Sequence, residues 1–292
     1  MAMMQEFQEF EKNYPRRTML ISEKEFSYRY YENGDTTLVL LTGGLGFSDL
    51  FFTHYKVFSK KYSVLTFDYP YGFPTNIELA DAIAELINKL GIKKVYLVGQ
   101  SYGGLIGQVI AKFHPEVVEG LIFSNTGSLS SSMGSEGKIC MNDMIMGLRK
   151  TVRILKFLPI SLLKPIMLKK LMGHIKDLTD ENKIFMSELF QYAVKILTSR
   201  HELHMCRLMI DLNNQWDMTA KDFILFKDKV LLILSNDDAT FNNEVKQSLI
   251  DIMPNPIVKT GISGGHLALF LKIEDYVKIV EDFVDSRETY QK

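Results

Sequence analysis

Cysteine is scarce in this chain, with only Cys140 and Cys206 among 292 residues. Two cysteines this far apart have no zinc-type spacing and make no disulfide framework, so we expect two reduced thiols and a cytoplasmic protein. An excess of charge is also lacking, since 34 Lys and Arg stand against 35 Asp and Glu. This balance, without any RNP, zinc-finger or basic-leucine pattern, argues against a nucleic-acid partner.

Long apolar runs are absent too. The longest, such as residues 230–234, fall well short of the roughly 20 apolar residues that a membrane-spanning helix needs. Residues 1–17 mix acidic, polar and aromatic side chains and lack the apolar core of a signal peptide. We therefore expect a soluble protein with no integral membrane segment. A hydrophobic content of 46% is enough for one large core with a small insertion.

What the chain does contain is a series of short apolar runs typical of buried strands. Residues 18–22 and 26–31 flank Lys24-Glu25 and predict an antiparallel hairpin. Later runs predict parallel strands with both faces covered, at residues 37–41, 64–67, 95–98, 120–123, 230–234 and 256–260. Helical spacing of apolar residues at 77–90 and 101–113 places helices between strands. The alternation predicts an α/β fold with a doubly wound, mostly parallel sheet and an N-terminal antiparallel hairpin.

The alternation is interrupted once. Residues 128–220 contain no convincing buried strand and become rich in methionine, leucine and lysine after a polar, flexible lead-in at 128–135. We interpret them as a helical cap inserted into an α/β core formed by residues 1–127 and 221–292.

Within this insertion, residues 138–176 are strongly basic. They hold nine Lys or Arg and one acid, a net charge of +8, so the rest of a chain whose total is −1 carries −9. Methionines and leucines are interleaved with these charges. Such a segment can lie on an anionic membrane or receive an acyl chain. The alternative is a set of ordinary cap helices, each with one buried and one solvated face.

The most informative motif is Gly99-Gln100-Ser101-Tyr102-Gly103, which joins the apolar run at 95–98 to the helical pattern that follows. This context is that of a nucleophile elbow, a tight strand-to-helix turn that presents a serine at its tip. Residues 261–265 also spell Gly-x-Ser-x-Gly, but no uninterrupted buried strand precedes them and no long helical pattern follows. The motif predicts Ser101 as a nucleophile.

A serine hydroxyl needs a base and a carboxylate to become nucleophilic, and after this elbow they follow in the order acid, histidine. Asp237 and Asp238 come directly after the run at 230–234, and His266 lies on a glycine-rich loop after the last predicted strand. We interpret the other histidines as surface or core residues. His201 and His204 have the spacing of metal ligands on a helix, but no third ligand accompanies them, so no metal site is predicted.

A hydrolytic serine also needs two donors for the oxyanion, normally backbone N–H groups. The N–H of Tyr102, directly after the serine, is the natural first donor. For the second we choose Gly44, with Leu45 as the alternative, in the glycine-rich loop 42–47 after the third strand. This loop lacks the endings and spacings of nucleotide-binding loops.

With these residues in place, the chain resembles the α/β-hydrolase superfamily over most of its length. The resemblance rests on Thr42-Gly43-Gly44, Asp68-Tyr69-Pro70, the elbow at Ser101, the acid at Asp238 and Gly265-His266. It implies Ser101 as nucleophile, His266 as base and Asp238, rather than Asp237, as acid. Many members have His-Gly in place of Thr42-Gly43, and proline in place of Ala239. Residues 42–52, 67–73, the elbow region and 157–173 are similar to maspardin-like members, which are regarded as binding or regulatory proteins with a degraded triad.

The sequence thus predicts a serine hydrolase of the α/β-hydrolase class that cleaves a carboxylic ester, or a thioester or amide, through an acyl-enzyme. Its predicted partner is a small-molecule ester or acyl substrate, and neither a metal nor an organic cofactor is needed. The alternative is a non-catalytic, maspardin-like binding protein. The oligomeric state has no signature in the sequence.

Overall fold

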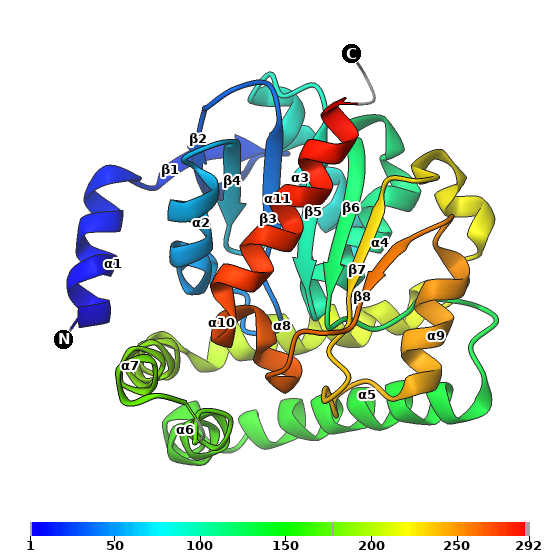
Figure 1. Ribbon diagram of the computed structural model, residues 1–292. Coiled ribbons are helices and arrows are strands. Elements are labelled where there is room, and N and C mark those ends of the chain that lie inside the picture. Colours follow the sequence, from blue (N-terminus) through cyan, green and yellow to red (C-terminus); the bar gives the residue numbers. More distant parts are fainter. Residues whose placement is uncertain (1, 177, 290–292) are drawn as a thin grey trace.

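The computed structural model describes residues 2–176 and 178–289, which form an eight-stranded sheet flanked by helices (Figure 1). The strand order is β1-β2-β4-β3-β5-β6-β7-β8. β2 pairs antiparallel with β1 and β4, and the other pairs are parallel. The strands are β1 (Arg17–Ile21), β2 (Lys24–Tyr31), β3 (Thr37–Leu41), β4 (Ser63–Phe67), β5 (Val95–Gln100), β6 (Val118–Ser124), β7 (Val230–Ile233) and β8 (Ile257–Lys259). The predicted fold class and N-terminal antiparallel hairpin are confirmed.

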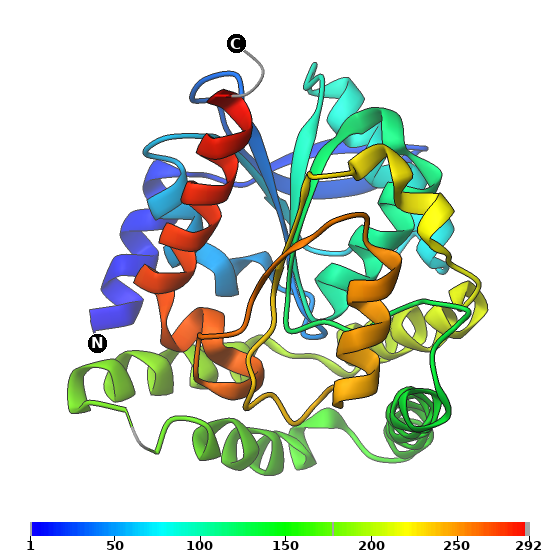
Figure 2. The ribbon, with the colours of Figure 1, turned by 45° about the vertical axis from the view of Figure 1, so that its right-hand side comes forward.

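Helices cover both faces of the sheet. The α-helices are α1 (Ala2–Asn13), α2 (Phe52–Phe58), α3 (Asn76–Lys89), α4 (Tyr102–Phe113), α5 (Ser135–Leu155), α6 (Lys164–Gly173), α7 (Asp180–Ile196), α8 (Ser199–Asp211), α9 (Asn243–Ile252), α10 (Ala268–Leu271) and α11 (Ile273–Thr289). Short 3-10 helices are η1 (Ser48–Phe51), η2 (Pro115–Val117), η3 (Ile160–Leu162), η4 (Leu212–Gln215), η5 (Ala220–Phe226) and η6 (Gly265–Leu267). Figure 2 shows α2 and α11 on one side of the sheet and α3, α4 and α9 on the other.

The core is divided by the sheet because side chains alternate along each strand. In β3, Val39 and Leu41 join the cluster formed with α3, α4 and α9, whereas Leu38 and Leu40 join the cluster formed with α2 and α11. All residues of β3, β4 and β5 are buried. This explains why the central strands are continuous apolar runs.

Two details of the strands differ from the sequence predictions. The hairpin turn lies at Ser22 and Glu23, which have φ values of 46° and 63°, while Lys24 and Glu25 already pair within β2. Two left-handed residues match the twist of a hairpin better than the predicted turn at Lys24-Glu25. The last strand is shorter than predicted and only partly buried, with Lys259 exposed, because β8 is an edge strand with a neighbour on one side only.

The N-terminal helix α1 was not predicted. Met3, Phe7 and Phe10 are buried at helical spacing, and α1 packs against α2 and α7. The Phe7 ring lies 5.0 Å from that of Tyr192 in α7. The three apolar residues were a signal of an amphipathic helix, although polar neighbours obscured it.

Helices α5 to α8 lie beyond the carboxyl ends of the parallel strands in both views (Figures 1 and 2). The chain leaves and returns at one point, where Ser130 bridges Met218 and the Ser131 N–H donates to the Met218 carbonyl at 2.9 Å. The division into a core and a cap at residues 128 and 220 stays a prediction. The predicted flexible lead-in is anchored at its start, because Ser128 and Ser130 are buried and the Ser128 hydroxyl lies 3.0 Å from that of Ser248.

None of the helices within the described parts of the chain is both long and apolar enough to cross a membrane. Cys140 and Cys206 are free thiols, and Cys206 is buried in α8. Burial, followed by the nearby Glu202 carboxylate, raises the pKa of the Cys206 thiol to about 12.

Candidate active site

Ser101 lies at the sharp turn between β5 and α4. Its backbone has φ 53° and ψ −118°, a strained conformation for a residue with a side chain. A Cβ atom on Gly99 would lie 2.4 Å from the Gly103 carbonyl oxygen, and one on Gly103 would lie 2.0 Å from the Leu41 carbonyl oxygen. The turn therefore requires glycine at both positions. By contrast, Ser263 of the second Gly-x-Ser-x-Gly lies in an irregular loop.

The structure brings the predicted serine, histidine and acid together in one line of hydrogen bonds. His266 Nε2 lies 3.0 Å from Ser101 Oγ, and His266 Nδ1 lies 3.1 Å from Asp238 Oδ2. The histidine comes from η6, just after β8, and the aspartate from the loop after β7. With Nδ1–H donating to the carboxylate, Nε2 is free to accept the serine proton.

Asp238 is held as an anion. Its side chain is fully buried, and burial alone would raise its pKa; the hydrogen bond and charge of His266, together with the Thr240 N–H, outweigh this and lower the pKa of Asp238 below its ordinary value. The Thr240 N–H donates to Asp238 Oδ1 at 2.8 Å. The carboxylate is thereby fixed in position and paired with the imidazole.

The neighbouring Asp237 is exposed and does not reach His266. Its carboxylate accepts a hydrogen bond of 2.9 Å from the Gly264 N–H, and this bond lowers the pKa of Asp237. Of the two carboxylates left open by the sequence motif, the structure brings Asp238 to the histidine. Asp237 instead fastens the loop that precedes His266.

Two buried polar residues join the site loops to one another, and sequence reasoning missed both. Asn125, directly after β6, has φ 38°, and its amide donates to the Gly265 carbonyl at 2.7 Å and to Ser235 Oγ at 3.1 Å. It also accepts a 2.8 Å bond from the Ser235 N–H. Gln100 donates to the His266 carbonyl at 3.2 Å. A polar residue at the carboxyl end of a buried strand was the available signal for both.

Of the two predicted oxyanion donors, Tyr102 directly follows Ser101, whereas Gly44 stays a prediction. Tyr102 is the first residue of α4, so its N–H has no carbonyl partner within the helix. On the opposite loop, a Cβ on Gly43 would lie 3.5 Å from Ser101 Cβ and 2.5 Å from Gln100 Oε1, whereas one on Gly44 would face Met209. Gly43 thus packs against the serine side chain, and Gly44 follows it at the rim of the pocket.

One histidine of the α8 pair, His201, supports this loop. His201 Nε2 lies 2.7 Å from the Leu45 carbonyl oxygen, its ring stacks on Phe47 at 4.1 Å, and Tyr71 approaches Nδ1 at 3.3 Å. Burial lowers the pKa of both His201 and His204. Within residues 2–176 and 178–289, no group of three or more His, Cys, Asp or Glu side chains could hold a metal ion.

A narrow cavity of about 30 Å³ opens beside Ser101. No charged side chain lines it, and the Trp216 indole N–H is buried without an acceptor among the described residues. The lining comes from the elbow, α4, α5, α8, the η4 segment and the loop after β7, and consists of Ser101, Tyr102, Leu105, Met141, Met144, Ile145, Leu148, Met209, Leu212, Trp216 and Phe241. The lining is complementary in polarity to an apolar group, and flexible methionines can change the shape of so small a cavity.

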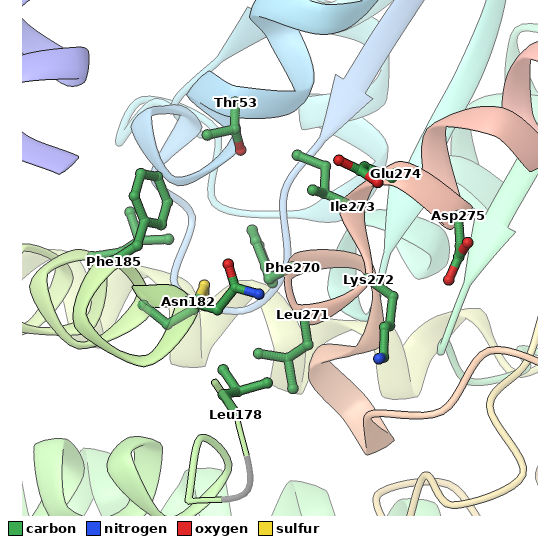
Figure 3. A pocket seen from close by; sticks show the side chains of 12 residues that line it. Thr53, Leu178, Asn182, Phe185, Phe270, Leu271, Lys272, Ile273, Glu274 and Asp275 are labelled. Atoms are coloured by element: carbon green, nitrogen blue, oxygen red, sulfur yellow. The ribbon is translucent and has the colours of Figure 1, made fainter. Parts of the chain in front are cut away.

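A wider cavity of about 450 Å³ lies between α7 and the start of α11 (Figure 3). Phe185, Phe270 and Leu271 line one part of it, and Glu274 and Asp275 project at the side of α11. Ser101, His266 and Asp238 do not line this cavity. Size alone therefore does not identify the reacting site.

Comparisons with known proteins agree with this architecture. A sequence model for the family described as alpha/beta hydrolase fold matches residues 36–153. Proline iminopeptidase of Lactobacillus helveticus is 24% identical over 285 residues, covering 86% of this chain and 90% of that protein. RutD of Pantoea ananatis, named as a candidate carbamate hydrolase, is 29% identical over 112 residues, and the match spans 35% of this chain but only 40% of the relative.

Among solved structures, the enol-lactonase of Burkholderia xenovorans has a TM-score of 0.72 at 16% identity, covering 92% of this chain and 100% of the other. This likeness concerns the fold. From the fold and these matches together, the chain belongs to the α/β-hydrolase superfamily.

Proposed function

We propose that this chain is a serine hydrolase that cleaves a carboxylic ester through an acyl-enzyme, with Ser101 as nucleophile, His266 as base and Asp238 as orienting acid. The observation that carries the proposal is the continuous line of hydrogen bonds from Asp238 Oδ2 through both ring nitrogens of His266 to Ser101 Oγ. A base within 3.0 Å of a strained, presented serine is the requirement for activating its hydroxyl.

The first half-reaction follows from this geometry. Ser101 Oγ attacks the ester carbonyl carbon while its proton passes to His266 Nε2, and the Asp238 carboxylate stabilises the imidazolium through Nδ1–H. The negative charge on the carbonyl oxygen is received by the N–H groups of Tyr102 and Gly44. His266 then gives its proton to the leaving alkoxide as the ester C–O bond breaks.

In the second half-reaction, water replaces the alcohol. His266 removes a proton from the water as it attacks the acyl carbon, and the same proton then returns to Ser101 Oγ when the acid product leaves. Neither half needs a redox group, since no oxidation state changes. A thioester or an amide enters the same steps with a different leaving atom.

The pocket supports an apolar acyl group as the part of the substrate next to Ser101. Its lining is uncharged, so a charged acyl group would lose its hydration there without gaining a counter-ion. Each methylene that the pocket covers contributes about 0.8 kcal/mol. The selectivity of the enzyme should therefore depend on acyl chain length.

A fluorophosphonate probe tests the assignment, because it reacts with activated serines. The wild type should be labelled, and Ser101→Ala and His266→Ala should lose labelling by at least roughly 10⁴-fold in rate. Asp238→Asn should lose roughly 10³-fold to 10⁴-fold because the tautomer of His266 is no longer fixed. Asp237→Asn is the matched control, with a rate within a fewfold of wild type.

The competing function is that of a non-catalytic binding protein with the same fold. Failure of correctly folded wild-type protein to react with the probe, and to hydrolyse any p-nitrophenyl ester from acetate to decanoate, would establish that alternative. Equal losses in the Asp237 and Asp238 variants would reject the assigned acid while leaving the nucleophile in place.

A further inference from the structure

The outer side of α5, η3 and α6 exposes large apolar side chains. Phe157 is 85% exposed, Ile166 is 68% exposed and Leu162 is 59% exposed. In α6, Leu168 and Leu171 are partly buried against the core, whereas Ile166 is on the exposed part of the helix. Large apolar side chains exposed within one short stretch of the chain favour an interaction site. We call the surface made by these three residues and the exposed basic residues around them the outer face.

The outer face is also basic. Lys150, Arg153, Lys156, Lys169 and Lys170 are exposed on α5 and α6 and in the turn between them. None of them forms an ion pair with another side chain that the structure describes. Residues 138–176 carry +8 while the rest of the chain carries −9. The charge is therefore concentrated on one part of the surface and is not neutralised there.

The opposite side of α5 lines the cavity beside Ser101. Met144 and Leu148 of α5 line the cavity beside Ser101, whereas Met146 between them is 64% exposed. Both views place α5 and α6 at the margin of the molecule, below the sheet (Figures 1 and 2). A surface in contact with the outer face would thus lie one helix away from the proposed acyl pocket.

We propose that the outer face docks this protein on the surface of an anionic lipid bilayer. Lysine and arginine pair with lipid phosphates and the negative surface potential, while Phe157, Leu162 and Ile166 enter the boundary between headgroups and acyl chains. Projecting apolar side chains surrounded by separate cations suit a deformable anionic surface. Because none of the described helices could span a membrane, the contact is peripheral.

Flotation with lipid vesicles tests the proposal independently of any hydrolase activity. The wild type should float with vesicles of phosphatidylcholine containing 30% phosphatidylglycerol, whose surface is negatively charged, and stay in solution with pure phosphatidylcholine. Raising the salt to about 1 M, where the Debye length is about 3 Å, should release it.

Two sets of variants separate charge from apolar contact. Lys156→Gln, Lys169→Gln and Lys170→Gln combined should lower the partition coefficient more than tenfold, since each lysine contributes about fivefold. Phe157→Ser, Leu162→Ser and Ile166→Ser combined should do the same at low salt. The matched control for charge combines Lys60→Gln, Lys93→Gln and Lys221→Gln, which are exposed lysines elsewhere on the surface. The matched control for apolar contact combines Ile224→Ser and Leu225→Ser, which are also exposed. Both controls should bind vesicles like wild type.

Four results would overturn the proposal. These are equal binding to neutral and anionic vesicles, no binding to either, unchanged binding of both outer-face variants, and a wild-type dimer in solution that the Phe157, Leu162 and Ile166 variant converts to a monomer. The last result would mean that a second copy of the chain covers the outer face. Circular dichroism of each variant verifies that it is folded, so that loss of binding reports on the surface.

Discussion

The Asn125 side-chain amide donates a 2.7 Å hydrogen bond to the carbonyl oxygen of Gly265, and thereby fastens the residue before His266 to the end of β6. Through Ser235, the same side chain also holds the loop that leads to Asp238. One buried residue therefore fixes the spacing between the proposed base and the proposed acid. It touches neither reacting atom, so its role is positioning.

We expect Asn125→Gly, which tolerates the left-handed backbone at φ 38°, to lower kcat/KM for ester hydrolysis by roughly tenfold to a hundredfold, since small misplacements of the base are costly. KM should change little. The measurement is steady-state kinetics at a temperature well below unfolding. Asn255→Gly, at an exposed left-handed residue with φ 50°, is the control. A loss in stability without any loss in kcat would assign Asn125 a purely structural role.

Enlarging the pocket beside Ser101 should shift the preference for acyl chain length of the ester substrate. Met144→Ala should raise kcat/KM for longer acyl esters relative to acetate, by roughly fourfold for each extra methylene accommodated. A p-nitrophenyl ester series measures this ratio. Met146→Ala, on the exposed side of the same helix, should leave the profile unchanged. If the Met144 variant kept the wild-type profile, the acyl group would have to lie elsewhere.

Substitution of the elbow glycine Gly103 should lower stability far more than substitution of Gly261. Gly103→Ala places a methyl group 2.0 Å from the Leu41 carbonyl oxygen, which only a backbone shift can relieve, so the free energy of unfolding should fall by about 3 kcal/mol or more. Gly261→Ala meets no atom within 4 Å and should stay within about 0.5 kcal/mol of wild type. Urea unfolding measures both. Equal stabilities would show that the turn relaxes without cost.

The buried His54 should make the folded protein less stable as the pH falls. Burial lowers its pKa to about 4, against the smaller opposing effect of its bond to the Leu269 carbonyl. The unfolded chain, with a histidine pKa of about 6.5, therefore binds more protons between pH 6.5 and 4, and stability falls as the pH falls through this window. His54→Phe should abolish roughly 2 kcal/mol of the loss between pH 7 and pH 5. Parallel stability curves for the two proteins would contradict this.

Much of the fold could be predicted from the sequence because short-range patterns encode it. Buried parallel strands are apolar on both faces, and the elbow needs glycine at Gly99 and Gly103 for steric reasons that lie within a few residues. The sequence predictions missed features that depend on contacts between distant parts of the chain. The helix α1 owes its burial to α2 and α7, and β8 is short because nothing covers its outer edge.

By itself, the sequence determined the α/β class, the antiparallel hairpin, the turn at Ser101 and the order of serine, acid and histidine. Only the tertiary structure decided that Asn125 and Gln100 join the loops and that a narrow apolar cavity lies beside Ser101, and it brought to His266 the carboxylate of Asp238, which the family resemblance had implied. The physical reason is separation along the chain. His266 lies 165 residues from Ser101, and contacts at that range follow from how helices and loops pack on the sheet, which no local periodicity encodes.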